Sequence, residues 1–539
     1  MALKFAYRQS ASGYNMKSAL YVILLAVAAP AFALDGQVGI HDPSTIVLCN
    51  RKFYTFGTGG TALVSDDGWT WRTGTRASRS GMAPDLIHIG DRYYQYIARN
   101  VGAQPKAEIN MIWTKSLDPE SPDYKWEEGG LVASTNGIED CNGIDPGVLL
   151  DPNDGRLWMV YGSYFGYIRL VELDPKTGKR LNPDDKPRDI AINCEASDMI
   201  YHDGWYYLLA THGSCCRGAD SGYNIRVGRA KKVTGPFLDH IGVDMIRGGG
   251  KLLIGSGGRV IGAGHFGLLD LGDTVQKFSM HWEADLDRGG ASVLDIRPLL
   301  WKDGWPVAGE NLKEGAYEIE SVRTGTALEL AVEGMPVGGR RAGRGGGGFG
   351  GPGGRGGGRD APAAPGAPGQ AAGAGGRGAP AGSPGAVPGG GGGRGMFGGT
   401  GAPIPPQDVA QVSMNWPAGS VDVRMSNYLC QAQQKWAVTA VPNAGGYLGS
   451  PYFKITIAGT DRTLAASEDA ELVALPAFTG APEQLWRFDQ LADGTWRIMP
   501  KSVPNSKESL ALSAVGSSFA TLAKFDLKSE KQRWVLKTP

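Results

Sequence analysis

Four acidic side chains in the N-terminal half of the chain stand in similar local settings. Asp42 belongs to a His-Asp-Pro-Ser motif, Asp145 to Ile-Asp-Pro, Glu195 to Glu-Ala-Ser, and Asp85 to Ala-Pro-Asp. Each acid precedes or opens an apolar run. Carboxylates that converge raise one another's pKa, which is costly unless the group has a chemical task. An inverting glycoside hydrolase needs such a cluster of acids. One carboxylate acts as general base on a water molecule, and a protonated carboxyl group donates its proton to the leaving oxygen.

The elements that carry these acids repeat along the chain. Between residues 38 and 307, five phrases combine a β-type apolar run, a polar turn and an aromatic-rich run. The turn Asp203-Gly204 is typical, because Asp-Gly between apolar runs is a strong hairpin signal. Radially repeated antiparallel sheets explain this pattern, whereas an irregular β-sandwich does not explain the recurrence. We therefore predict an all-β fold in which residues 34–307 form a five-bladed β-propeller, the catalytic domain.

Propeller geometry predicts that the acids lie close together in the fold. Each blade starts with its innermost strand, so residues that open different blades meet at the central axis although they lie far apart in sequence. We expect Asp42, Asp145 and Glu195 to surround one sugar-sized hollow, with Asp85 close by.

Composition excludes one class of partner. Lys and Arg together number 54, as do Asp and Glu, and the formal net charge is zero. A nucleic-acid-binding domain would show a basic excess, so we expect no nucleic-acid partner. A neutral polysaccharide needs no electrostatic steering and is compatible with this balance.

The N-terminal residues have the pattern of a signal peptide. A basic start at Met16 precedes an apolar run over 19–28 and the small-residue cleavage pattern Ala-Phe-Ala at 31–33. The run is too short for a comfortable membrane span. We predict a signal peptide over 1–33, a start at Met16 and a mature protein from Leu34, secreted or periplasmic, monomeric and free of the membrane. An uncleaved anchor is the alternative.

The six cysteines are compatible with an oxidising compartment, but their spacing does not fix a pairing. Cys215 and Cys216 are adjacent. They form either a vicinal disulfide or two thiols, and the sequence leaves both possibilities open.

The C-terminal part has a different composition and its own repeats. Residues 335–405 are almost entirely Gly, Pro, Ala and Arg, a composition that predicts disorder because it buries too little apolar surface. Three Gln-x-Trp motifs follow, ending at Trp436, Trp486 and Trp534. This pattern resembles a ricin-type β-trefoil lectin over 313–537, with the Gly-rich run inserted in its first repeat. Such a domain would be a weak or degenerate carbohydrate-binding module.

Several motifs in the N-terminal half together resemble glycoside hydrolase family 43, and in particular its arabinanases. They span nearly all of residues 38–307 and occur in the expected order. They are His-Asp-Pro-Ser at 41–44, Asn-Gly-Ile-Asp-Pro at 142–146, Cys-Cys-Arg-Gly at 215–218, Thr-Gly-Pro-Phe at 234–237 and Gly-Ala-Gly-His at 262–265.

The resemblance implies a role for each acid. Asp42 would be the general base, Glu195 the general acid, and Asp145 the residue that tunes the pKa of Glu195 and orients it. It also implies that His265 supports a calcium-type ion, mostly coordinated by water, in the propeller channel. The candidate substrate contacts are Asn142, Ser163 and Asp85.

The implied function is an inverting glycosidase that cleaves α-1,5-L-arabinan or a related arabinose polysaccharide of plant cell walls. An exo-acting α-L-arabinofuranosidase or β-xylosidase of the same family is one alternative, and a non-catalytic polysaccharide-binding protein is another. Two departures leave endo or exo action open. Met82 stands where arabinanases carry Trp, and His281-Trp282-Glu283 replaces an aromatic pair after His.

Overall fold

The computed structural model describes residues 34–102, 105–164, 166–332 and 408–539. The predicted signal peptide (1–33) and the predicted Gly-rich insertion (335–405) lie outside the described residues. No helix within the described part of the chain has the length and apolar character that a bilayer crossing requires.

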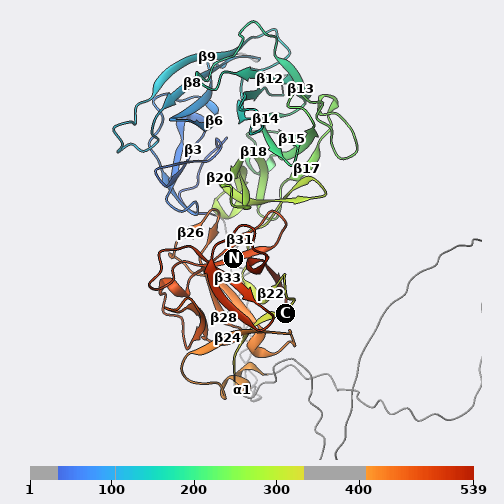
Figure 1. Ribbon diagram of the computed structural model, residues 1–539. Coiled ribbons are helices and arrows are strands. Elements are labelled where there is room, and N and C mark those ends of the chain that lie inside the picture. The colour runs from blue at the N-terminus through green and yellow to red at the C-terminus, as the bar shows by residue number, and fades with distance from the viewer. Residues whose placement is uncertain (1–33, 103–104, 165, 333–407) are drawn as a thin grey trace, which may run out of the picture. The chain divides into compact units, whose positions relative to one another are not determined.

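Antiparallel sheets between residues 35 and 308, described except for 103–104 and 165, form the five blades of a β-propeller, which confirms the prediction (Figure 1). The first blade carries β1 (Asp35–Gly36) as an additional outer strand. The blades are, from the inside outward, β2 (Val47–Cys49), β3 (Lys52–Phe56), β4 (Ala62–Ser65) and β5 (Thr70–Thr73); β6 (Met82–Ile89), β7 (Arg92–Arg99), β8 (Lys106–Thr114) and β9 (Glu127–Asn136); β10 (Gly147–Leu150), β11 (Leu157–Tyr161), β12 (Tyr167–Leu173) and β13 (Arg188–Ile192); β14 (Glu195–His202), β15 (Trp205–His212), β16 (Asn224–Ala230) and β17 (Lys251–Ile254); and β18 (Val260–Asp270), β19 (Gln276–Asp285), β20 (Ala291–Lys302) and β21 (Trp305–Ala308).

The hairpin turns follow the sequence signals. Asp203 and Gly204, with φ of 46° and 76°, connect β14 to β15. Both residues lie in the left-handed region that two-residue hairpins require. Backbone hydrogen bonds also close the ring of blades, because the amide of Leu294 in β20 donates to the Val38 carbonyl at 2.8 Å.

In each of the five blades, the innermost strand or the segment that leads into it has one backbone distortion of the same kind. Asp42, Ala83, Asp145, Ala196 and His265 all have φ between 44° and 56°. In three blades the strand ladder skips residues at this point, as it does in a β-bulge. A bulge re-aims side chains at the end of a strand, and left-handed backbone in non-glycine residues is concentrated at functional sites. The distortion therefore marks the places where side chains meet at the axis.

The C-terminal region is also built mainly of strands. In each Gln-x-Trp motif the Gln ends a short 3-10 turn and the Trp begins the strand that follows. The three indoles are fully buried. Each indole N–H donates to a leucine carbonyl, those of Leu328, Leu464 and Leu512. The region comprises β22 (Gly315–Ser321), β23 (Ala327–Leu330), α1 (Val409–Ser413), β24 (Val421–Ser426), β25 (Trp436–Ala440), β26 (Gly446–Tyr447), β27 (Ser450–Pro451), β28 (Phe453–Ile457), β29 (Thr463–Ala466), β30 (Leu472–Leu475), β31 (Trp486–Gln490), β32 (Trp496–Pro500), β33 (Leu510–Val515), β34 (Phe519–Lys524) and β35 (Trp534–Lys537).

Candidate active site

The structure brings Asp42, Asp145 and Glu195 together from blades one, three and four. Their exposed fractions are only 8, 6 and 8%. Asp145 Oδ2 accepts the backbone N–H of Ala196, the neighbour of Glu195, at 3.1 Å. The charges of Glu195 and Asp42 both raise the pKa of Asp145, so the three acids act on one another electrostatically.

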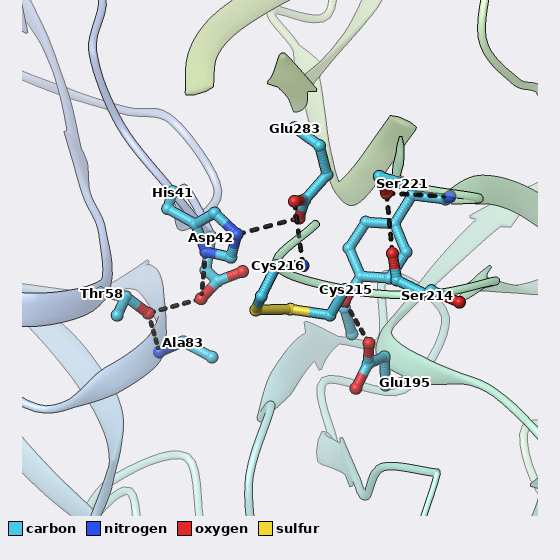
Figure 2. Close-up of a disulfide and its surroundings, with 12 residues drawn as sticks. His41, Asp42, Thr58, Ala83, Glu195, Ser214, Cys215, Cys216, Ser221 and Glu283 are labelled. Carbon is cyan, nitrogen blue, oxygen red and sulfur yellow. Dashed lines mark hydrogen bonds and ion pairs between the residues drawn. A yellow bond between two sulfur atoms is a disulfide. The ribbon is translucent and has the colours of Figure 1, made fainter. Parts of the chain in front are cut away.

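Asp42 is surrounded by hydrogen-bond donors (Figure 2). Its Oδ2 accepts the Thr58 hydroxyl at 2.5 Å and lies 2.9 Å from His41 Nδ1, while Oδ1 lies 3.1 Å from His265 Nδ1. Burial by itself would raise the pKa of Asp42. The charge and hydrogen bond of His265, together with those of His41, outweigh it and hold the pKa well below the usual range. Asp42 is therefore ionised at neutral pH.

Asp145 and Glu195 have the opposite character. Burial, followed by the charge of Glu195, raises the pKa of Asp145 to about 8. Burial also raises the pKa of Glu195, although its hydrogen bonds from Tyr223 and Ser163 act in the other direction. Two coupled buried carboxylates titrate as a pair, and this pair retains a proton near neutral pH.

The Glu195 carboxyl group is fixed by two hydroxyls. Ser163 Oγ donates to Oε2 at 2.8 Å, and the Tyr223 hydroxyl donates to Oε1. Ser163, a predicted substrate contact, is thus a partner of Glu195. The sequence motifs assign no role to Tyr223. It directly precedes β16, and no sequence pattern shows that its hydroxyl reaches Glu195.

Two other predicted substrate contacts occupy different settings. Asn142 is fully buried, and neither polar atom of its side chain has a hydrogen-bond partner among the described residues. Asp85 is hydrogen-bonded to the backbone of both neighbouring blades. Its Oδ1 and Oδ2 accept the backbone N–H groups of Thr45 and Val148 at 3.0 and 2.9 Å, so it joins the first and third blades to the second. Asp85 lies two residues beyond the distorted backbone position that Asp42 and Asp145 occupy, and so belongs to a different level of the axis.

Asp85 lines a small hollow in the propeller channel. Thr45, Ser197, Asp198 and His265 also line it. Burial, and then the charge of Asp85, raises the pKa of Asp198 well above its usual range. The Ser197 hydroxyl is buried and has no hydrogen-bond partner in the described part of the chain.

A second group of side chains adjoins Asp42 (Figure 2). Glu283 Oε1 lies 2.9 Å from His41 Nε2 and 3.3 Å from His281 Nε2, and Oε2 accepts the Cys216 backbone N–H at 2.9 Å. Cys215 and Cys216 form a disulfide, which resolves the alternative left open by the sequence. Burial would raise the pKa of Glu283, but the two histidines lower it to about 2.

Comparison with known proteins places this site in a family. Residues 50–306 match the model of glycosyl hydrolases family 43. The extracellular exo-α-(1→5)-L-arabinofuranosidase ArbA of Cellvibrio japonicus is 33% identical over 307 residues, which cover 51% of this chain and 87% of that protein. The chain belongs to glycosyl hydrolases family 43.

Two further proteins are similar to this chain. The extracellular endo-α-(1→5)-L-arabinanase 1 of Bacillus subtilis is 28% identical over 294 residues, which cover 50% of this chain and 87% of that protein. The solved structure of Cellvibrio cellulosa α-L-arabinanase complexed with arabinohexaose has 32% identity and a TM-score of 0.47, covering 50% of this chain and 96% of that one.

Membership of glycosyl hydrolases family 43 confirms the resemblance inferred from the motifs and makes the chain a glycosidase. The two departures from the arabinanase pattern lie close to Asp42. Met82, 42% exposed, precedes Ala83, whose N–H donates to the Thr58 hydroxyl that binds Asp42. Glu283 reaches Asp42 through His41.

Proposed function

We propose that this glycosidase is an inverting enzyme that hydrolyses α-1,5-linked L-arabinan. The names of both relatives specify α-(1→5)-L linkages, and the chain aligns with 87% of each. One observation carries the proposal: an ionised carboxylate, Asp42, lies in the same site as a carboxyl pair, Asp145 and Glu195, that retains a proton. Inverting hydrolysis needs both states at once.

Each residue then has a defined part in the reaction. Asp42 removes a proton from water as the water oxygen attacks the anomeric carbon. Glu195 gives its proton to the departing sugar oxygen as the glycosidic bond breaks, so one proton enters the enzyme and one leaves it. Asp145 tunes the pKa of Glu195 as its coupled partner, because two adjacent buried carboxyl groups resist carrying two negative charges at once, so the pair keeps one proton until that step.

An exo-acting enzyme of the same family is the second candidate, because ArbA carries an exo-acting name. Linear arabinan distinguishes the two. An endo-acting enzyme releases a ladder of oligosaccharides, whereas an exo-acting enzyme releases short products from one end only. A β-xylosidase would instead act on xylo-oligosaccharides.

The catalytic assignment is tested by Asp42→Asn and Glu195→Gln, with Asp285→Asn as a matched control. Asp285 is equally buried, lies on β19, and bonds to the Asp287 N–H instead of a catalytic group. We expect each catalytic substitution to lower kcat by about 10²- to 10⁴-fold. A wild-type protein that binds arabinan yet releases no reducing sugar would instead be a polysaccharide-binding protein.

A calcium ion in the channel is a further part of the proposal. The donors that line the channel fit a hard cation, since carboxylate and hydroxyl oxygens predominate. His265 would support it, with most of the coordination shell supplied by water, and the unpaired Ser197 hydroxyl lines the same hollow. A bound cation would neutralise the two buried carboxylates of this hollow, Asp85 and Asp198, and thereby stabilise the ring of blades.

We also infer that the enzyme is exported and that its C-terminal region is a ricin-type trefoil. Export is supported by the signal pattern over 1–33 and by relatives named extracellular. The trefoil is supported by the three-fold recurrence of a buried Trp whose indole donates to a leucine carbonyl.

A further inference from the structure

Glu283 occupies an unusual place for a carboxylate that is not one of the three proposed catalytic acids. It lies near the end of β19 in the fifth blade and is only 4% exposed. No Lys or Arg forms an ion pair with it among the described residues, and its ion-pair partners there are His41 and His281. A buried carboxylate needs compensating donors, so its position indicates a defined task.

His41 links Glu283 to Asp42. Its Nδ1 lies 2.9 Å from Asp42 Oδ2, and its Nε2 lies 2.9 Å from Glu283 Oε1. Because both ring nitrogens are engaged, the imidazole cannot rotate without breaking one of these contacts. A histidine whose far nitrogen is bound by a carboxylate has a fixed ring orientation, and here that orientation presents Nδ1 to Asp42.

The other oxygen of Glu283 is fixed as well. Oε2 accepts the backbone N–H of Cys216, which forms the vicinal disulfide with Cys215 in the loop that follows β15 (Figure 2). His281, two residues before Glu283 on β19, lies 3.3 Å from Oε1 through Nε2 and accepts the Asp42 backbone N–H at Nδ1. Glu283 therefore connects the strand, the loop and the Asp42 segment.

We infer that Glu283 is a positioning residue for the glycosidase reaction and holds the Asp42 carboxylate in place through His41. The inference rests on the proposed function, in which Asp42 is the base. Glu283 touches neither substrate nor the reacting atoms in this assignment. Its effect is on the geometry of the base.

The first test compares Glu283→Gln and Glu283→Asp with Asp285→Asn on linear arabinan. Glutamine keeps the size but loses the charge that binds His41. We expect Glu283→Gln to lower kcat by about 10-fold while KM changes less than about 3-fold, since base catalysis as a whole is worth about 10²- to 10⁴-fold. Glu283→Asp, which keeps the charge, should recover part of this loss, and Asp285→Asn should resemble wild type. An unchanged kcat, or a rise in KM alone, would overturn the inference.

The second test separates positioning from general damage to the fold. If Glu283 acts through Asp42, Glu283→Gln should reduce the residual rate of Asp42→Asn by less than about 2-fold, because coupled residues are not additive. An undiminished 10-fold loss in that background would overturn the inference. Full activity of Asp42→Asn alone would instead refute the proposed function, so the two failures are distinguishable. Thermal unfolding of each variant checks that the fold is retained.

Discussion

At the scale of single residues, the site depends on neighbours that give identical functional groups different protonation states. Asp42 lies beside two imidazoles and stays ionised, whereas Asp145 lies beside Glu195 and itself has a pKa of about 8. Residue type alone does not predict this division. The sequence motifs point to the three acids, but His41, Thr58 and Tyr223 act through side-chain directions that no linear pattern contains.

The pH profile of the wild-type enzyme should reflect this division. The acid must be protonated, and the pair loses its proton as the pH rises through about 8. We therefore expect kcat/KM to fall above about pH 8 and to hold down to acidic pH, where Asp42 finally takes up a proton. Asp145→Asn leaves Glu195 without a second carboxyl group to resist its ionisation, so the alkaline limb should move to lower pH. An alkaline limb that does not move would contradict the tuning role of Asp145.

Tyr223→Phe should move the same limb in the opposite direction. The Tyr223 hydroxyl donates to Glu195 and lowers its pKa, so its removal should raise that pKa. We expect kcat to fall by about 10-fold, because the acid also loses one of its two fixed contacts. Tyr206→Phe is the matched control, since that hydroxyl bonds to Asp151 instead of a catalytic acid. Coincident profiles for Tyr223→Phe and wild type would argue against this role.

At the scale of strands, much of the propeller could be predicted from the sequence. The residue types in turns such as Asp203-Gly204 favour the left-handed backbone that a two-residue hairpin requires. The apolar runs beside such a turn form paired strands. The distorted backbone at the inner strands could not be predicted in this way, because Asp, Ala and His all occupy the same left-handed position. For this reason the sequence alone does not show that Asp85, a predicted substrate contact, stands two residues beyond the distorted position on its strand.

Asp85 should be a structural residue whose loss weakens the propeller. Asp85→Ala leaves the Thr45 and Val148 N–H groups without their acceptor, and each unsatisfied buried donor costs about 1–3 kcal/mol. We expect the free energy of unfolding to fall by about 2–6 kcal/mol in urea titration. Asp85→Asn, which keeps one carbonyl oxygen, should lose less. Equal stability of Asp85→Ala and wild type would rule out this role.

At the scale of the whole molecule, two kinds of internal repeat follow each other along one chain. The three Gln-x-Trp motifs could be located from sequence because each is a local signal. Their shared hydrogen bond, from the indole to a leucine carbonyl, joins residues 22 positions apart in two of the motifs and 108 positions apart in the first, between Trp436 and Leu328. Sugar binding by this region has no comparably local signal.

Calcium should stabilise the propeller as a unit if the channel holds it. A ligand that binds only the folded state stabilises it by about 2.7 kcal/mol at 100 times its Kd, so Tm should rise with added calcium and fall with a chelator. Asp198→Asn removes one of the two buried carboxylates of the channel and should reduce the calcium-dependent shift. Calorimetry that shows the same Tm with calcium and with chelator would exclude the site.

The backbone shape shared by the five inner strands also bears on how such an enzyme can be altered. A carboxylate, an imidazole and a methyl group all occupy that left-handed position, so the same backbone shape accommodates side chains of different chemistry in different blades. Ala83 and Ala196 present only a methyl group at this position. They are the natural points at which to install an additional functional group around the axis, leaving the framework of the enzyme as it stands.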